Sequence, residues 1–317
     1  MNVPVGSHAL MAIGFAVIGL IATGCASKSA PNDDKTTFAS YEFYRNATAK
    51  LTYDGQTFLL DPMFAAKGTL PSFAGKSPNP TINLTVDIEQ IVADIDGVIV
   101  SHMHTDHFDE AAAQSLPKDI RIYTPRNSAP ANPADPVNSN ASFQSQLEAM
   151  GFRNVITIAS QTGQPIRIDG ITLTQVFGQH GAGLVGDLMG GVNGIVFEAD
   201  GQPTIYWTGD TILDDGGQIK AILARYRPDV IIAHTGGAVV EAIAPNPLMM
   251  NEEQAIEFFQ AAQEANPDVH IVAVHMDALD HCLTTRASLQ LAIDRSEASE
   301  KLKVSLPLEG QTILFSD

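Results

Sequence analysis

A short cluster of three histidines and one aspartate restricts the fold and function of this chain more than any other feature of its sequence. His102, His104, Asp106 and His107 follow directly after the apolar run Gly97–Ser101. Such a run is typical of a short strand that is covered on both faces. Three imidazoles and a carboxylate at the end of one strand cannot all be satisfied as core side chains, so we expect them to form a functional site.

The spacing of these four side chains favours metal binding. Imidazole nitrogens and carboxylate oxygens are the usual ligands of zinc and of harder first-row ions. His102 and His104 are two residues apart, so on extended backbone their side chains point in the same direction. Asp106 and His107 fall where the chain turns into a helix capped by Asp109. The pattern predicts two adjacent ions; a mononuclear or structural site made of histidines alone is the alternative.

Isolated ligand-type residues also stand at the ends of other predicted strands. They occur in Leu60-Asp61-Pro62, Gln179-His180-Gly181, Gly209-Asp210-Thr211 and Val274-His275-Met276. Taken singly, each has a simpler interpretation, because histidine and aspartate are common in turns and Asp61 precedes a proline. Their repeated position at strand ends favours convergence on the first cluster.

Strands and helices alternate along the chain, and Asp54-Gly55 predicts a two-residue hairpin turn. The predicted strands cover 47–53, 57–61, 97–101, 121–124, 155–158, 166–177, 194–198, 204–207, 230–233 and 270–274, and the predicted helices cover 111–116, 216–226, 251–264 and 288–299. Early hairpins followed by strand–helix units favour two sheets packed face to face with helices outside. Two long connections, Met63–Leu84 and Pro125–Ser142, are either lids over a site or surface insertions.

The order of these motifs resembles the metallo-β-lactamase superfamily, and the resemblance covers nearly all of residues 41–310. It implies the αββα sandwich of that family, with two mixed sheets, and two divalent ions, zinc first and manganese or iron as alternatives. It also implies a role for each motif residue: His102, His104 and His180 on the first metal, Asp106, His107 and His275 on the second, Asp210 between them, and Asp61 accepting a hydrogen bond from a ligand imidazole.

The resemblance implies hydrolysis by a hydroxide shared between two ions, which lower the pKa of water towards about 7. Asp106 would hold the proton of that nucleophile. Within the superfamily, four segments resemble the branch of L-ascorbate-6-phosphate lactonase, which implies an ester, lactone or phosphoester substrate: Leu60-Asp61-Pro62, His107-Phe108-Asp109, Gly209-Asp210-Thr211 and Arg227-Pro228-Asp229-Val230. A phosphodiesterase resembling N-acyl phosphatidylethanolamine phospholipase D is the alternative, and a non-catalytic ligand-binding relative is a third hypothesis.

Two more histidines are candidates for catalytic roles. His281 lies six residues after His275, where it can overhang the site as a substrate contact or proton donor. His234 follows the apolar strand 230–233 and precedes Thr235-Gly236-Gly237, which places it near the same strand ends. A structural role is the simpler interpretation of each.

The first 40 residues differ from the rest of the chain. Ala9–Ala22 is almost continuously apolar, and Ile21–Cys25 resembles a bacterial lipobox, although no Lys or Arg precedes it and Ala22 stands where leucine is usual. We therefore expect a signal or lipoprotein segment at 1–25, a linker at 26–40 and a hydrolase domain at 41–317. This predicts export and a lipid anchor at Cys25 on the periplasmic face of the cell envelope; a plain secretory peptide and a cytoplasmic protein are the alternatives.

The charge balance bears on the partners. Asp and Glu number 36 against 18 Lys and Arg, a formal net charge of −18. This excess of carboxylates repels phosphate backbones and argues against nucleic acid as a partner. We expect a small-molecule substrate, and contact with a membrane surface only through Cys25. The one other cysteine, Cys282, is predicted to be a buried apolar side chain.

Overall fold

The computed structural model describes residues 39–126, 142–158, 165–190, 192–296 and 301–315. The compact unit that they belong to spans Thr37–Asp317. The predicted signal segment and most of the predicted linker lie outside the described residues, but Ala39 and Ser40 already belong to the first strand. Within the described residues, no helix is long and apolar enough to cross a lipid bilayer.

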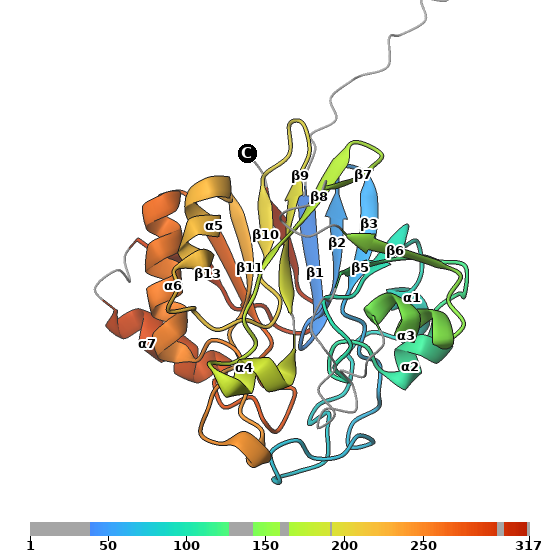
Figure 1. The fold of residues 1–317 in the computed structure, drawn as a ribbon, viewed down its shortest axis with the longest axis horizontal. Helices are drawn as coiled ribbons and strands as arrows, with labels where there is room; N and C mark the ends of the chain where they lie inside the picture. The colour runs from blue at the N-terminus through green and yellow to red at the C-terminus, as the bar shows by residue number, and fades with distance from the viewer. Residues whose placement is uncertain (1–38, 127–141, 159–164, 191, 297–300, 316–317) are drawn as a thin grey trace, which may run out of the picture. The chain divides into compact units, whose positions relative to one another are not determined.

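Two mixed sheets of seven strands each form the centre of the fold (Figure 1). The first sheet is antiparallel from β14 to β3 and parallel from β3 to β6. Its strands, in spatial order, are β14 (Thr312–Phe315), β1 (Ala39–Arg45), β2 (Thr48–Tyr53), β3 (Gln56–Leu60), β4 (Gly97–Ile99), β5 (Arg121–Pro125) and β6 (Asn154–Ile158).

The second sheet repeats this pattern, with a parallel half and an antiparallel half. It is parallel from β13 to β10 and antiparallel from β10 to β7. Its strands are β13 (Lys303–Ser305), β12 (His270–Val274), β11 (Val230–His234), β10 (Ile205–Trp207), β9 (Asn193–Glu198), β8 (Ile171–Phe177) and β7 (Ile166–Ile168).

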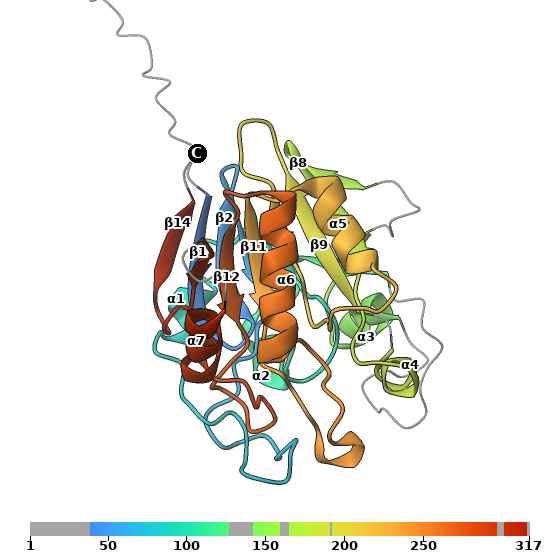
Figure 2. The same ribbon diagram turned by 90° about the vertical axis from the view of Figure 1, so that its left-hand side faces the viewer.

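Three apolar layers hold the sandwich together. Side chains such as Phe58, Phe197 and Trp207 pack between the sheets. A second layer lies under α5 (Gln218–Tyr226), α6 (Glu252–Ala265) and α7 (Arg286–Arg295), and a third under α1 (Ile88–Ile91), α2 (Glu110–Ser115) and α3 (Phe143–Ala149). The helices therefore cover the two outer faces (Figures 1 and 2), which confirms the predicted αββα architecture.

Local sequence signals explain most element boundaries. Asp54 and Gly55 both have positive φ, as the predicted hairpin turn between β2 and β3 requires. The side chain of Asp109 accepts a hydrogen bond from the N–H of Ala112 and caps α2, and Asn251 caps α6 in the same way. These three predictions are confirmed.

One predicted element is wrong. Residues 166–177 were expected to form a single strand, but they form the two antiparallel strands β7 and β8. The turn between them is Asp169-Gly170, and both residues have positive φ. An Asp-Gly pair is a hairpin signal, but the apolar residues on both sides hide it in a search for continuous strands. The closing helix also starts earlier than predicted, at Arg286, because Thr285 and Ser288 form a capping box.

Candidate metal centre

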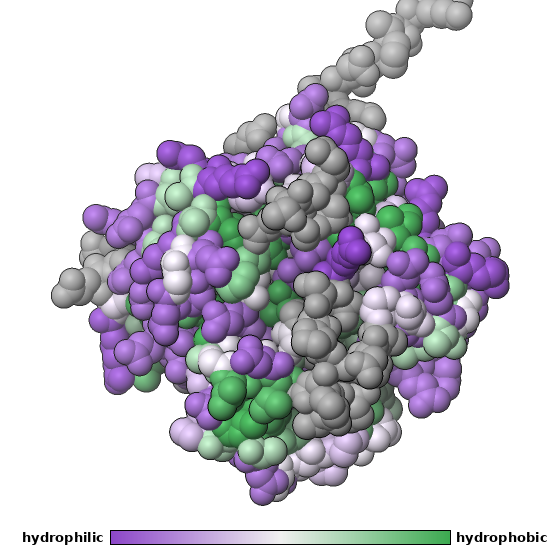
Figure 3. Space-filling model, viewed as in Figure 1, coloured by the Kyte–Doolittle hydropathy of each residue, from purple (hydrophilic) through white to green (hydrophobic). Residues whose placement is uncertain are grey.

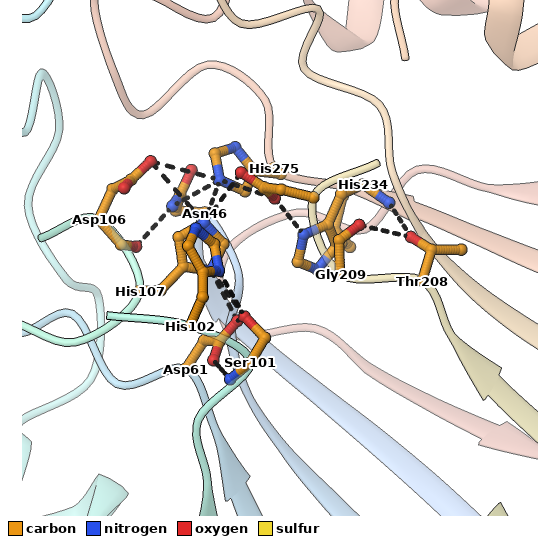
Figure 4. A network of polar contacts seen from close by, with 12 residues as sticks. Asn46, Asp61, Ser101, His102, Asp106, His107, Thr208, Gly209, His234 and His275 are labelled. Carbon is orange, nitrogen blue, oxygen red and sulfur yellow. Dashed lines mark hydrogen bonds and ion pairs between the residues drawn. The ribbon is translucent and has the colours of Figure 1, made fainter. Parts of the chain in front are cut away.

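The polar residues predicted from strand ends come together in space. Figure 4 shows Asp61, His102, Asp106, His107 and His275 among them. Asp61 follows β3, and the segment from His102 to His107 follows β4, so both come from the first sheet. The second sheet contributes His180 after β8, Asp210 after β10 and His275 after β12. The carboxyl ends of strands from both sheets therefore form the site together.

Three imidazoles make up the first cluster of possible metal ligands. Nδ1 of His104 lies 2.9 Å from Nε2 of His102 and 3.1 Å from Nε2 of His180. His102 and His180 are buried, and His104 is partly exposed. The cluster therefore has one side that is accessible from solvent.

Hydrogen bonds outside the cluster fix the orientation of two of these rings. Nδ1 of His180 lies 2.8 Å from the carbonyl oxygen of Leu248, so it is the protonated nitrogen and donates. Nδ1 of His102 lies 2.9 Å from Oγ of Ser101, whose own proton goes to Asp61. In both neutral rings Nε2 is therefore left with a lone pair that points into the cluster.

Burial favours the neutral, metal-binding form of these rings. It holds the pKa of His102 well below its usual value and lowers that of His180 to about 4. The inward nitrogens of His102 and His180 therefore both present lone pairs towards Nδ1 of His104, at 2.9 and 3.1 Å. A cation bound at this point could accept these lone pairs, so the donor set fits a metal ion.

The second cluster combines histidines with carboxylates. Nε2 of His107 lies 3.1 Å from Nε2 of His275 and 3.2 Å from Oδ2 of Asp210. Oδ2 of Asp106 lies 3.5 Å from Nε2 of His275. Oδ2 of Asp210 also lies 3.9 Å from Nε2 of His180, so this one oxygen reaches both clusters.

Asp61 accepts an imidazole hydrogen bond of the kind that the family resemblance implied. It is buried, accepts from the backbone N–H and the hydroxyl of Ser101 at 2.7 Å each, and lies 2.6 Å from Nδ1 of His107. Nδ1–H of His107 donates to it, which leaves Nε2 for the second cluster. Such a carboxylate fixes both the orientation and the tautomer of a ligand histidine.

Charge in the second cluster is strongly coupled. Burial alone would raise the pKa of Asp210, but His107 and His275 hold it well below its usual value. Burial likewise acts to lower the pKa of His107, and Asp210, Asp61 and Asp106 raise it well above the usual value. The carboxylates are therefore ionised and require positive charge beside them, which an imidazolium or a bound cation can supply.

The structure places His234 and His281 differently. His234 is completely buried behind Asp210, with Nδ1 2.7 Å from Oδ1 of that residue. His281 lies on the other side, with Nε2 3.6 Å from Oδ2 of Asp106 and its ring edge-on to Phe73. His281 therefore lies beside Asp106, whereas His234 lies behind Asp210.

Sequence reasoning missed several residues of this site. Asn46, in the turn between β1 and β2, donates to the backbone oxygen of Asp106, and its Nδ2 lies 3.3 Å from Nε2 of His275. Asn46 has positive φ, which asparagine tolerates, but one such residue in a turn does not indicate a site. Cys282 is buried as predicted, yet its Sγ lies 3.5 Å from Nδ1 of His275.

The connection Met63–Leu84 is firmly attached beside the site. The buried guanidinium of Arg45 donates to the carbonyl oxygens of Met63, Ala65 and Ile82. Burial lowers the pKa of Arg45 to about 10, which leaves it cationic at neutral pH.

Asp280 holds the middle of the same connection. Its carboxylate accepts hydrogen bonds from the Ser72 hydroxyl, the Asn79 amide and the backbone N–H groups of residues 73, 74, 76 and 77. The segment next to His281 is therefore an ordered wall of the site. Of the other long connection, residues 127–141 lie outside the described residues.

This fold and this donor set define a class of protein, the metal-dependent hydrolases built on an αββα sandwich. Residues 56–276 match the family described as "Beta-lactamase superfamily domain". The chain belongs to the metallo-β-lactamase superfamily.

Relatives of similar length support this assignment. The UPF0173 protein YddR of Bacillus subtilis is 32% identical over 86% of this chain and 98% of its own length. A UPF0173 metal-dependent hydrolase of Xanthobacter autotrophicus is 30% identical over 62% of this chain and 76% of its own length. The isothiocyanate hydrolase from Delia radicum gut bacteria has a similar structure, with a TM-score of 0.74 and 33% identity over 88% of this chain and 100% of that one. A possible metal-dependent hydrolase from Veillonella parvula has a TM-score of 0.73 and 30% identity. The match covers 87% of this chain and 99% of that one.

Proposed function

We propose that this protein is a two-metal hydrolase that adds water to an electrophilic carbon of a small organic substrate, and that isothiocyanates belong to its substrates. One observation carries the two-metal assignment: Oδ2 of Asp210 lies between the two ligand clusters, 3.2 Å from His107 and 3.9 Å from His180. A carboxylate in this position can bridge two cations.

In this proposal His102, His104 and His180 hold the first ion, and Asp106, His107 and His275 hold the second. Zinc is the first choice, because the set is rich in imidazole, and manganese and iron remain alternatives. When bound, the two ions lower the pKa of water and neutralise the negative charge that develops on the substrate. The orientation of the substrate and the transfer of protons depend on the side chains around the two clusters.

Asp106 and His281 lie together beside the second cluster. The charge of His107 and the contacts with His275 and His281 lower the pKa of Asp106 against the effect of burial, so Asp106 is ionised. It can accept the proton of the attacking water and orient that water. His281, 3.6 Å away, is placed to contact the substrate, and Phe73 packs against its ring.

The substrate class is supported by likeness and by the surface near the site. A solved protein that is 33% identical over its full length is an isothiocyanate hydrolase. The helix α4 (Leu184–Met189) follows the His180 loop, and its Leu184 and Leu188 are exposed. Figure 3 shows an apolar patch at the position of this helix, which suits an organic side chain better than a sugar. An isothiocyanate R–N=C=S takes up water at its central carbon, its C–N bond breaks, and the nitrogen takes the protons to leave as R–NH₂ with carbonyl sulfide.

The test is a substrate panel on the metal-loaded protein. It contains benzyl isothiocyanate, a γ-lactone, a p-nitrophenyl ester, a phosphodiester and a β-lactam, with zinc or manganese added. We expect loss of the isothiocyanate with one amine released per molecule, abolished by chelation and restored by metal. Turnover of the lactone, ester or phosphodiester alone would leave the hydrolase assignment intact and replace its substrate. A metal-loaded protein inert to the whole panel would favour the ligand-binding hypothesis.

The ligand assignment is tested separately. His107→Ala should lose most activity and much of the second metal, measured by elemental analysis. His270→Ala is the matched control, because His270 begins β12 and so lies at the opposite end of that strand from His275. Full turnover of His107→Ala would contradict the two-metal assignment.

We also propose that the protein is exported and anchored by a lipid on Cys25. The apolar segment Ala9–Ala22 and the lipobox-like Ile21–Cys25 support this proposal. An anchored hydrolase would meet its substrate in the cell envelope.

A further inference from the structure

The only tryptophan of the chain is hydrogen-bonded to a histidine of the metal centre. Trp207 ends β10 and His234 ends the neighbouring parallel strand β11. Nε1 of Trp207 donates to Nε2 of His234 at 3.0 Å, and Nδ1 of His234 lies 2.7 Å from Oδ1 of Asp210. All three side chains are buried, so water does not compete for these bonds.

These bonds allow only one direction of donation. The indole N–H can donate but not accept, so Nε2 of His234 must carry a lone pair. The proton of the neutral imidazole is then on Nδ1, which donates to Asp210. The hydrogen bonds run from Trp207 through His234 to the carboxylate, and no other tautomer of His234 satisfies both contacts.

The same contacts exclude His234 as a metal ligand. By distance it groups with His107, Asp210 and His275 as a possible fourth donor. Both of its ring nitrogens are engaged, however, one with an indole proton and the other with a carboxylate oxygen. Its ring stacks on that of His107 at 5.8 Å between centroids, which holds it beside the cluster.

The bond from His234 divides the tasks of the two Asp210 oxygens. Oδ1 receives the proton of His234, and Oδ2 is the oxygen that reaches both ligand clusters. A rotation of the carboxylate would break the bond to His234. The hydrogen bond from His234 therefore fixes the Asp210 carboxylate in the orientation in which Oδ2 faces both ligand clusters.

We propose that Trp207 and His234 are positioning residues for the bridging carboxylate of Asp210, and that the indole of Trp207 consequently senses occupation of the metal centre. This inference rests on the two-metal assignment made above. A metal bound to Oδ2 would withdraw electron density from the carboxylate and so weaken its hydrogen bond from His234. The weaker bond to Asp210 would alter the electron density of the His234 ring and hence the strength of the hydrogen bond from the indole N–H. Two hydrogen bonds connect that N–H to the Asp210 carboxylate.

Trp207→Phe tests the proposal, because it keeps an aromatic ring in the core and removes only the N–H donor and part of the ring. Zn²⁺ affinity and stoichiometry are measured on metal-free protein by competition with a chromophoric chelator. We expect two ions in the wild type and about 10- to 100-fold weaker binding of one of them in the variant, the range found when a partner of a ligand is removed. His234→Ala should have a similar effect, and the double variant should be no worse than His234→Ala alone.

Tyr206→Phe is the matched control. Tyr206 is the neighbour of Trp207, it is equally buried, and its hydroxyl has no hydrogen-bond partner among the described residues. It packs on the other face of the sheet, among the residues under the helices. Its removal should leave Zn²⁺ binding unchanged. If Tyr206→Phe weakens Zn²⁺ binding as much as Trp207→Phe, a general loss of packing around β10 explains both effects. The proposed link from Trp207 through His234 to Asp210 is then wrong.

A second measurement needs no variant. The chain has one indole, so an isotope-labelled sample gives one indole ¹⁵N–¹H resonance, and this resonance should shift when Zn²⁺ is added to metal-free protein. A wild type that binds one ion would defeat the two-metal assignment. If the wild type binds two ions and the indole resonance does not shift, the proposed link from Trp207 to Asp210 is wrong while the two-metal assignment stands. The same conclusion follows if Trp207→Phe binds Zn²⁺ with unchanged affinity.

Discussion

The carboxylate oxygen Oδ2 of Asp61 lies 2.6 Å from Nδ1 of His107, and neither side chain reaches solvent. The two residues come from the ends of the neighbouring strands β3 and β4, which are joined by parallel pairing. Ser101 donates twice to the same carboxylate, so Asp61 cannot turn away from His107.

Asp61→Asn should weaken metal binding about 10- to 100-fold. The amide can present its NH₂ group to Nδ1 of His107, which moves the imidazole proton to Nε2 and blocks the nitrogen that faces the second cluster. Metal content after dialysis measures the effect. Asp96→Asn, which alters an exposed carboxylate that accepts a bond from Thr57, is the control and should keep its metal. Equal metal content in both variants would show that Asp61 does not orient a ligand.

Asp280→Ala should release the segment of residues 72–79 without removing metal. The carboxylate accepts several backbone and side-chain hydrogen bonds, and these lower its pKa overall although burial raises it. Hydrogen bonds to a charged group contribute about 1.5–3 kcal/mol each, so loss of the anchor should raise local opening at least tenfold. Trypsin cleavage after Lys67 or Lys76 measures this opening. An unchanged cleavage rate would mean that Arg45 alone holds the connection.

His281→Ala should lower kcat/KM by about tenfold or more while metal content stays at the wild-type level. The reason is its position beside Asp106 and Phe73, outside the set of side chains proposed to hold the metals. His281→Gln keeps a hydrogen-bonding side chain and should recover part of the loss. Loss of metal from His281→Ala would instead make this residue part of the metal centre.

His270 should remain neutral in the folded protein well below pH 6. Its burial, together with the charge of Lys303, lowers its pKa to about 4. Between pH 6.5 and 4 the unfolded chain therefore binds more protons at this residue than the folded chain, so its contribution to stability falls as the pH falls through that window and is constant above it. An NMR titration of the His270 ring gives the pKa directly. His270→Asn should lose less stability than the wild type between pH 7 and 5 in denaturant unfolding, and a midpoint near 6.5 would contradict the prediction.

Cys25→Ser should release the protein from the membrane fraction if the lipid anchor exists. Cys282→Ser is the control, because Cys282 lies within the folded domain beside His275. Fractionation of expressing cells with detection by antibody measures the distribution. Membrane association that survives Cys25→Ser would favour an uncleaved apolar segment, and a cytoplasmic wild type would contradict export altogether.

The sequence allowed the fold and the metal cluster to be predicted because both rest on local signals. Apolar runs marked strands such as Gly97–Ile99, and the four ligand-type side chains after that strand marked the site. The residues at other strand ends are spread over more than 200 positions, and only the order of motifs in a known family related them to one another.

Other parts of the site have no local signal. Trp207 looks like an ordinary core residue, and its bond to His234 depends on the register of β10 against β11. Asn46 is separated from Asp106 by 60 residues and meets it only when the first sheet is complete. Asp280 looks like a surface carboxylate until the backbone of residues 73–77 folds around it. Such contacts follow from tertiary packing, which no spacing rule describes.

The two sheets share the ligand set, with His102, His104, Asp106 and His107 from the first and His180, Asp210 and His275 from the second. Cations bound between the two sheets would crosslink them. The sheets must therefore pack together before the complete binding site exists. If the chain is exported unfolded, it leaves the cytoplasm without bound metal and binds whichever metal ion is present in the compartment where it folds. The choice between zinc, manganese and iron would then be made by the compartment as much as by the ligands.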